Sequence, residues 1–188
     1  MRVTEVILFT LDSFNSFNEE ISGRTLLQKA IYFINTIYNF GLEFTPHYYG
    51  PHSNETSEEI QGLVAAGFIE EVNKKLPPLD FGGAHESRLY IYRLTESGKK
   101  LVEHLRSQIS DVANKVELVV GKILEADGTE TREKTLSISA KMHHILTLTK
   151  RPVDVEEILE EAEVIGWQIS REEAIKAIEF LKKLGLKV

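Results

Sequence analysis

The sequence predicts a mainly helical protein with one small β-hairpin, and three observations support this. Apolar residues recur at helical spacing through most of the 188 residues. Two short segments, 68–72 and 88–94, have a strand-like pattern instead, and the second alternates with a period of two. Glycine or proline stands where one segment gives way to the next, as expected where a chain must turn.

Two helices are expected first. Apolar residues over 3–14 recur at helical spacing and predict the first helix. After Gly23, a strong amphipathic pattern from Leu26 to Tyr38 predicts the second, with Ser22 as its N-terminal cap. Gly41 supplies the backbone conformation that ends it.

A turn, a third helix and two strands follow. Gly50-Pro51 forces a turn, and Ser53 is expected to cap a helix over 53–66 that Gly67 ends. The strands at 68–72 and 88–94 are joined by a polar loop that contains Gly82-Gly83. This order of helices, strand, loop and strand is that of a winged helix-turn-helix, in which the loop is the wing.

The C-terminal half is expected to be helical throughout. One long helix over 97–125 carries an apolar stripe of near-heptad spacing, and 126–130 is the clearest linker. Three shorter helices follow: 134–148, one capped by Asp154, and one beginning with the capping-box pattern Ser170–Glu173. We therefore predict a winged-helix domain at 1–96, a connecting helix at 97–126, and a small helical domain at 127–188.

A weak internal repeat links the two ends of the chain. The apolar and glycine positions at 60, 63, 67 and 68 share the spacing of those at 178, 181, 185 and 186. In both places a helical pattern stops at glycine and an apolar strand-like segment begins. The C-terminal domain is therefore either a plain helical unit or a second, truncated winged-helix-like unit.

Composition argues against several classes of function. The chain has no cysteine, which excludes disulfides, thiolate catalysis and cysteine-bound zinc. Its six histidines have no metal-binding spacing, and no phosphate loop or nucleophile motif is present. No segment has the roughly 20 apolar residues of a membrane helix, and the N-terminus lacks a signal-peptide layout. We expect a cytoplasmic, non-enzymatic protein without cofactor, metal or membrane partner.

Several motifs in the first 105 residues resemble a known family. They are Leu27-Gln28-Lys29 followed by Tyr32-Phe33, the run 47–53, and Leu63 with Gly67-Phe68-Ile69. Together they resemble the YwgA-like proteins of bacteria and archaea, which are similar to the Panacea domain of antitoxin-like proteins. Residues 93–98 also look like the joint that closes the wing in many winged-helix regulators. The resemblance implies a winged-helix fold and a regulatory or interaction role.

Two hypotheses of function remain. The first is a transcription-regulator-type protein that binds double-stranded DNA and forms a homodimer through 97–125. Its candidate nucleic-acid-binding residues are Arg24, Lys29, Ser53, Asn54, Ser57, Gln61, Arg88 and Arg93. The second is a protein-interaction adaptor or antitoxin-like module. Its candidate contact residues are Tyr48, Tyr49, Pro51, Glu55, Glu58 and Glu59. A plain packing role for the tyrosines between two helices stays open beside it.

Charge separates the two hypotheses. Residues 1–98 hold 7 Lys and Arg against 13 Asp and Glu, a net charge of −6. The third helix, which would enter the major groove, carries three glutamates and no basic residue. Carboxylates near phosphates are repelled, whereas basic residues release counterions and so favour binding. The fold favours DNA, and the local charge favours a protein partner.

Overall fold

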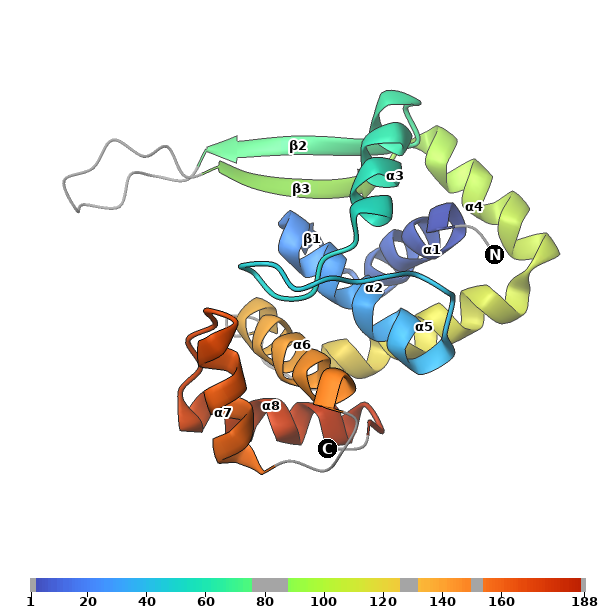
Figure 1. The fold of residues 1–188 in the computed structure, drawn as a ribbon. Helices are drawn as coiled ribbons and strands as arrows, with labels where there is room; N and C mark the ends of the chain where they lie inside the picture. The colour runs from blue at the N-terminus through green and yellow to red at the C-terminus, as the bar shows by residue number, and fades with distance from the viewer. Residues whose placement is uncertain (1–2, 76–87, 126–131, 150–153, 187–188) are drawn as a thin grey trace.

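A computed structural model describes residues 3–75, 88–125, 132–149 and 154–186 (Figure 1). Within these ranges the elements are α1 (Val3–Ser16), β1 (Ile21–Ser22), α2 (Arg24–Tyr38), α3 (Asn54–Ala65), β2 (Ile69–Lys75), β3 (Arg88–Leu94), α4 (Glu96–Gln108), α5 (Ser110–Glu125), α6 (Arg132–Thr149), α7 (Val155–Val164) and α8 (Arg171–Lys183). The mainly helical fold with a small hairpin is confirmed. The tip of the predicted wing and the predicted linker 126–130 lie outside the described residues.

The sheet has three antiparallel strands in the order β1-β3-β2. The predicted hairpin is confirmed, with Ile69 opposite Leu94 and Lys75 opposite Arg88. The short strand β1 was not predicted, and it corrects the cap of α2. Ser22 pairs with Ile91 in the sheet, so Gly23, with φ of 101°, takes the N-cap position and no side chain caps the helix. The winged-helix order of elements is therefore complete, with a third strand added.

The connection between α2 and α3 is much longer than the three or four residues of a tight helix-turn-helix. It leaves α2 at Asn39, whose left-handed conformation ends the helix two residues before the predicted Gly41. It then crosses over α2 and lies between α3 and α6 (Figure 1). Thr45 and His52 form an isolated antiparallel bridge within it. As predicted, Ser53 caps α3 by accepting a hydrogen bond from the Thr56 backbone N–H. This long connection separates the two helices.

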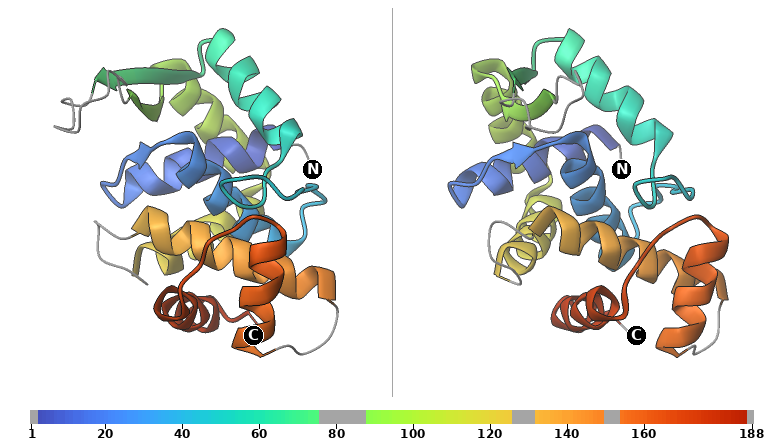
Figure 2. Two further views of the ribbon diagram at one scale, coloured as in Figure 1. Left: turned by 60° about the vertical axis from the view of Figure 1, so that its left-hand side comes forward. Right: turned by 90° about the vertical axis from the view of Figure 1, so that its left-hand side faces the viewer.

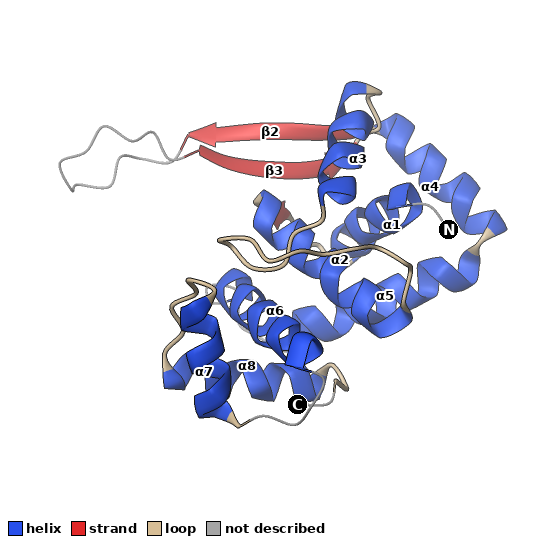
Figure 3. Ribbon diagram, viewed as in Figure 1, coloured by secondary structure: helices blue, strands red, loops and turns tan. Residues whose placement is uncertain are grey.

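The single long helix predicted over 97–125 is wrong. The chain bends at Ile109, whose φ of −134° and ψ of 49° are not helical, and two helices meet there (Figure 3). The bend lets α5 turn back along α1 and α2, where Val116, Val119 and Val120 are buried. A straight helix would carry this stripe away from the core. The stripe that suggested a dimer seam therefore belongs to the core of one protomer.

The apolar interior has two parts, and α6 contributes to both. The larger part joins α1, α2, the sheet, α5, α6 and α8, and includes the Phe33 and Phe180 rings, 5.6 Å apart at their centroids. The smaller part lies among α6, α7 and α8 around the buried Trp167. Figure 2 shows these three helices lying together beneath the N-terminal helices. Both predicted caps, Asp154 and the Ser170–Glu173 capping box, are confirmed.

The internal repeat predicted from the sequence is seen where α3 and α8 end. Gly67 follows α3 with φ of 76°, and Gly185 follows α8 with φ of 83°. Both glycines adopt the left-handed conformation that terminates a helix. After Gly185 the described residues contain only Leu186, and no strand is found in 132–149 or 154–186. The described C-terminal part is therefore a helical unit.

Candidate functional site: a cleft between α2, α3 and the sheet

The separation of α2 from α3 leaves a cavity of about 790 Å³, which we call the cleft. Its walls come from α2, α3, the sheet and the turn before α3, and α6 adds one carboxylate. The lining combines polar and charged groups with apolar ones: Gly23, Arg24, Thr25, Gln28, Lys29, His47, Tyr49, His52, Ser57, Ile60, Gln61, Val64, Ala65, Glu71, Tyr90, Tyr92 and Glu133. A cavity of this size and mixed character is typical of a small-molecule site.

The turn at residues 47–51, the aromatic turn, forms one wall of the cleft. Side chains from three parts of the chain hold its backbone. Lys29 Nζ on α2 donates to the Pro51 carbonyl at 2.6 Å, and Trp167 Nε1 donates to the His47 carbonyl at 2.8 Å. Ser137 Oγ on α6 donates to the Tyr49 carbonyl at 3.1 Å. Two residues of the C-terminal part, Ser137 on α6 and Trp167 in the loop between α7 and α8, thus help to fix a turn far away in the sequence.

Gly50 is required at the centre of the aromatic turn. Its φ of 97° lies in the left-handed region that side chains disfavour. A Cβ there would also lie 3.1 Å from Cγ of Lys141 and 3.2 Å from Cε of Lys29. The glycine therefore allows two lysine side chains to approach the backbone of the turn closely.

Lys29 is the most unusual charged group in the cleft. Its side chain is buried, with a relative exposure of 2%, and no carboxylate among the described residues forms an ion pair with it. Burial, with a contribution from nearby Lys141, lowers the pKa of Lys29 to about 7. One of its N–H groups bonds to the Pro51 carbonyl. An ammonium group that is buried and unpaired is energetically unfavourable, and such groups cluster at functional sites.

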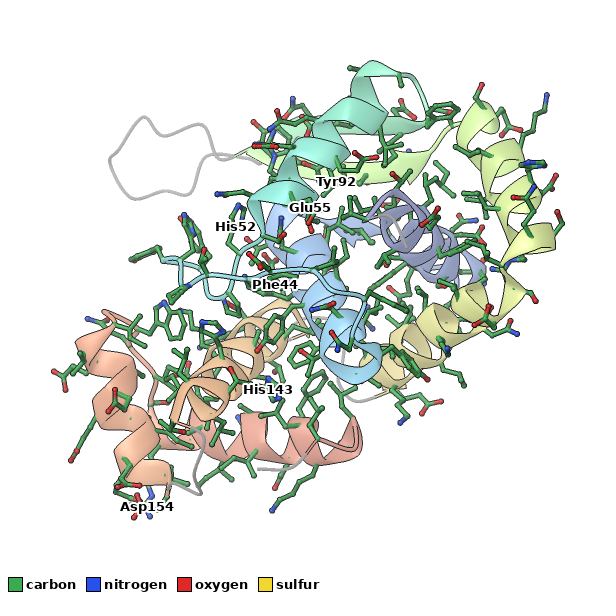
Figure 4. The ribbon with its side chains drawn as sticks, turned by 45° about the vertical axis from the view of Figure 1, so that its right-hand side comes forward. Phe44, His52, Glu55, Tyr92, His143 and Asp154 are labelled. Atoms are coloured by element: carbon green, nitrogen blue, oxygen red, sulfur yellow. The ribbon has the colours of Figure 1, made fainter. Side chains whose placement is uncertain are left out.

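Gln28 ties α2 to the start of α3. Its Nε2 donates to the Ser53 carbonyl at 3.1 Å and to Ser57 Oγ at 2.9 Å, and its Oε1 accepts from the Ser53 backbone N–H. Ser57 Oγ also lies 3.2 Å from Nε2 of His52. Burial, followed by the charges of His47 and Lys29, lowers the pKa of His52. Figure 4 shows His52 at the N-terminal end of α3. Both the amide nitrogen and the amide oxygen of Gln28 are therefore engaged in joining the two helices.

The wall formed by the sheet is a closed polar network. Arg24 Nε donates to the Tyr92 hydroxyl at 2.9 Å, and that hydroxyl donates to Glu71 at 2.6 Å. Arg24 also pairs with Glu71 at 3.2 Å, and its guanidinium lies 4.6 Å from the Tyr90 ring centroid. Burial raises the pKa of Tyr92, and the hydrogen bond to Glu71 raises it further. The opposite charges of this wall neutralise each other.

Of the eight residues predicted to bind nucleic acid, the structure gathers four, Arg24, Lys29, Ser57 and Gln61, around the cleft. Lys29 and Ser53 are buried, so neither belongs to an exposed surface that duplex DNA could contact, and Ser57 is bonded inside the cleft. Arg24 pairs with Glu71, and Arg93 pairs with Glu20. Asn54 and Gln61 are exposed on α3, and the Arg88 side chain lies outside the described part of the structure. The structure therefore does not bring these residues together as one exposed basic surface.

Four of the six residues predicted to contact a protein are exposed. Tyr48 and Tyr49 are 72% and 58% exposed, and their ring centroids are 4.9 Å apart in an edge-on arrangement. Glu55 and Glu58 are exposed on the neighbouring helix α3. Two of the six residues serve the fold instead: Pro51 is buried, and Glu59 accepts a hydrogen bond from Thr4 on α1.

Sequence reasoning missed three groups that shape the site: Trp167, Lys141 and Glu71. Trp167, in the loop between α7 and α8, and Lys141, on α6, reach the aromatic turn from the C-terminal part of the chain, and the Lys141 ammonium lies 5.6 Å from the Trp167 ring centroid. The signal for Trp167 was weak: it is the single tryptophan of the chain and follows Gly166. No local pattern relates position 167 to position 47, because their proximity depends on the tertiary fold.

Of the histidine pair on α6, His143 is bonded within the core. His143 Nδ1 lies 2.8 Å from the buried Tyr32 hydroxyl, and burial, together with the charge of His144, lowers the pKa of His143 to about 4 (Figure 4). Among the described residues no three His, Asp or Glu side chains are grouped as metal ligands. In the same ranges, each helix is too short or too polar to cross a membrane.

The fold and the cleft define a mainly helical protein with the element order of a winged helix, whose α2 and α3 are held apart. No protein-family model matches the sequence. The chain is 33% identical over 126 residues to a protein named uncharacterised protein YwgA from Bacillus subtilis (strain 168), a match that covers 61% of this chain and 71% of that protein. The chain therefore belongs to the YwgA family, which confirms this part of the resemblance noted above.

Proposed function

We propose that this protein is a non-enzymatic regulatory module that binds a protein partner through the aromatic turn and the adjoining acidic face of α3. The observation that carries the proposal is the aromatic turn itself. Its backbone is fixed by Lys29, Ser137 and Trp167, whereas the rings of Tyr48 and Tyr49 extend into solvent. A turn whose backbone is held in place before binding loses little backbone conformational entropy on contact. Tyrosine is also enriched among the residues that dominate interface energies.

Charge indicates the kind of partner. Glu55 and Glu58 are exposed beside the aromatic turn, and α3 carries no Lys or Arg. The complementary partner is a protein with a basic rim around an apolar pocket that receives the tyrosine rings. Such charge complementarity contributes mainly to specificity and to the association rate. An antitoxin-like role, similar to that of proteins with the Panacea domain, is one biological function that such partner binding would serve.

Transcription-regulator-type DNA binding is the second candidate, and the fold is what favours it. In a winged helix, α3 is the helix that enters the major groove, and here Asn54 and Gln61 are exposed on it. The acidic residues of the same helix oppose this role because they would approach the phosphates.

Photo-crosslinking in cells of the native host tests the first candidate. A photoreactive phenylalanine analogue at position 48 is expected to give one discrete adduct with a basic protein. The same analogue at Val164, which is 82% exposed on α7, is expected to give none. With the partner purified, Tyr48→Ala and Tyr49→Ala should each weaken binding by roughly 10-fold or more, as for interface hot spots. The matched control Leu118→Ala, on α5, should leave the affinity unchanged.

A titration with random-sequence duplex DNA separates the two candidates. The first predicts no binding even at low salt. Binding that falls steeply as salt rises and that is lost in Arg93→Glu would instead support the second. Equal crosslinking from positions 48 and 164 would contradict the first candidate.

A further inference from the structure

We infer that the cleft is a binding site for a small organic anion, a carboxylate or phosphate ester with an apolar or aromatic body, and that Lys29 is its anchoring cation. This inference goes beyond the proposed protein partner and does not depend on it. It rests on the shape of the cleft, on the state of the charged groups that line it, and on the side chains that face its interior.

The first step concerns charge. Arg24 and Glu71 on the sheet wall neutralise each other and are tied together through Tyr92. Lys29 has no such counter-ion among the described residues, and the nearby Lys141 has the same sign. An anion that binds next to Lys29 supplies the missing charge in a water-poor environment, where charge-assisted hydrogen bonds are strongest.

The second step concerns hydrogen bonds. Lys29 Nζ donates one hydrogen bond to the Pro51 carbonyl, whereas an ammonium group has three N–H donors. That single bond orients the amine without satisfying it. His47 and His52 line the same region, with ring centroids 5.2 Å apart. The Lys29 end of the cleft therefore offers more donors than the protein itself uses, which suits the oxygens of a carboxylate or phosphate.

The third step concerns the body of the ligand. Ile60, Val64 and Ala65 of α3 line the cleft together with Tyr49 and Tyr90. These groups offer an apolar, partly aromatic slot of the kind that buries the body of a small molecule. The volume of about 790 Å³ is far larger than an inorganic ion needs. The geometry therefore points to an organic anion.

One carboxylate in the lining, that of Glu133, would favour a cationic ligand instead of an anion. Glu133 comes from α6 and lies near Gly23 at the start of α2, and burial raises its pKa. If Glu133 were the anchoring group, the cleft would prefer a cation. The test therefore needs probes of both charges with the same ring.

Binding is measured on the full chain by two-dimensional NMR titration at about pH 6.5, where Lys29 with its pKa of about 7 is largely protonated. The probes are benzoate, phenyl phosphate, neutral benzamide and cationic benzylamine. We expect benzoate or phenyl phosphate to shift the resonances of cleft residues with a Kd of about 1 mM or lower, and benzamide and benzylamine to bind at least roughly 10-fold more weakly. The better of the two anions shows whether the site prefers a carboxylate or a phosphate.

Variants locate the site. Lys29→Met keeps a similar shape without the charge and should weaken binding of the anion by roughly 10-fold or more. Ala65→Trp, at an exposed position on the rim, should block the cleft without disturbing the core. The exposed Lys122→Met on α5 is the matched control and should bind as the wild type does. The inference is overturned if benzylamine binds best, if no anion binds at about 10 mM, or if Ala65→Trp leaves anion binding intact.

Discussion

At the scale of single residues, Lys29 links the fold to the cleft. Its amine holds the Pro51 carbonyl and so helps to shape the aromatic turn, and the same amine lines the cavity behind that turn. Tyr49 likewise belongs both to the cavity wall and to the exposed ring pair. A ligand in the cleft would therefore contact the inner side of the surface that we propose for a partner.

Lys29 also predicts how stability depends on pH. Its pKa is about 7 in the folded protein and 10.5 in an ordinary lysine side chain, so the unfolded state binds more protons between these values. Stability should therefore rise with pH from about 7 towards about 10, as the unfavourable burial of charge is relieved. Lys29→Met lacks the buried amine, so its free energy of unfolding should not show this rise. In urea denaturation, the free energy of unfolding of the wild type should therefore gain on the order of a few kcal/mol relative to that of Lys29→Met across this window.

Groups facing Lys29 define the control for this prediction. Lys141 is close, and the histidines 52 and 144, whose pKa values are lowered mainly by burial, carry little charge above pH 7. The free energy of unfolding of Lys141→Met should therefore retain most of the increase with pH that the wild type shows. Parallel pH profiles for the wild type and Lys29→Met would show that the amine is not desolvated as argued.

The sequence did hold a signal for the burial of Lys29. Position 29 lies three residues after Leu26 and four before Phe33, on the face of α2 that both of those residues bury. A lysine on such a face is usually a surface residue with a buried stem, and the sequence alone therefore favours a solvent-exposed ammonium group. What the pattern could not supply is the carbonyl of Pro51, because that contact depends on how the chain folds between α2 and α3.

At the scale of elements, the hairpin and α4 are packed closely where they meet. Thr95 caps α4 and also donates its Oγ1 to the Gly67 carbonyl at 2.7 Å. Gly98, in the first turn of α4, packs against the start of β2, so that a Cβ there would lie 2.1 Å from the Phe68 carbonyl oxygen. The end of α3, both strands and α4 are therefore fixed to one another at this point.

This joint predicts opposite effects for two glycine-to-alanine substitutions in helices. Gly98→Ala should lower the free energy of unfolding by about 1–3 kcal/mol, because the backbone must move to admit the methyl group. Gly62→Ala, in α3, has open space around the added Cβ and should raise it by about 0.5–1 kcal/mol through helix propensity. Thermal or urea unfolding measures both. Equal effects would mean that helix propensity alone governs these positions.

The elements also show where local patterns are sufficient. The caps at Ser53, Asp154 and Ser170 were predictable, because a cap depends on residues three apart in the sequence. The break at Ile109 was not, because no glycine or proline marks it and the apolar spacing continues across it. The bend follows from the docking of α5 on α1 and α2, which is a property of the assembled core. The strand β1 has only two residues and depends in the same way on its partner β3.

At the scale of the whole molecule, the C-terminal helices complete the N-terminal part. Leu136 and Ala140 of α6 and Leu181 of α8 are buried in the larger apolar cluster, alongside residues of α1 and α2. Arg132, at the start of α6, pairs with Glu19 at 3.0 Å. The domain boundary predicted at 127 remains a prediction, although the packing across it leads us to expect that the two parts unfold together.

Trp167 allows that expectation to be tested, because it is the single tryptophan and lies in the smaller cluster, whereas Phe180 lies in the larger one. Tryptophan fluorescence and far-UV circular dichroism should report one coincident unfolding transition. Phe180→Ala should shift both signals together, with a loss of about 3–5 kcal/mol, since a buried ring is removed from between α2 and α8. The control Ile175→Ala, half-exposed on the same helix, should cost less than about 1 kcal/mol. If the fluorescence transition stays in place while the dichroism shifts, the C-terminal helices form an independent unit and Trp167 does not transmit their stability to the aromatic turn.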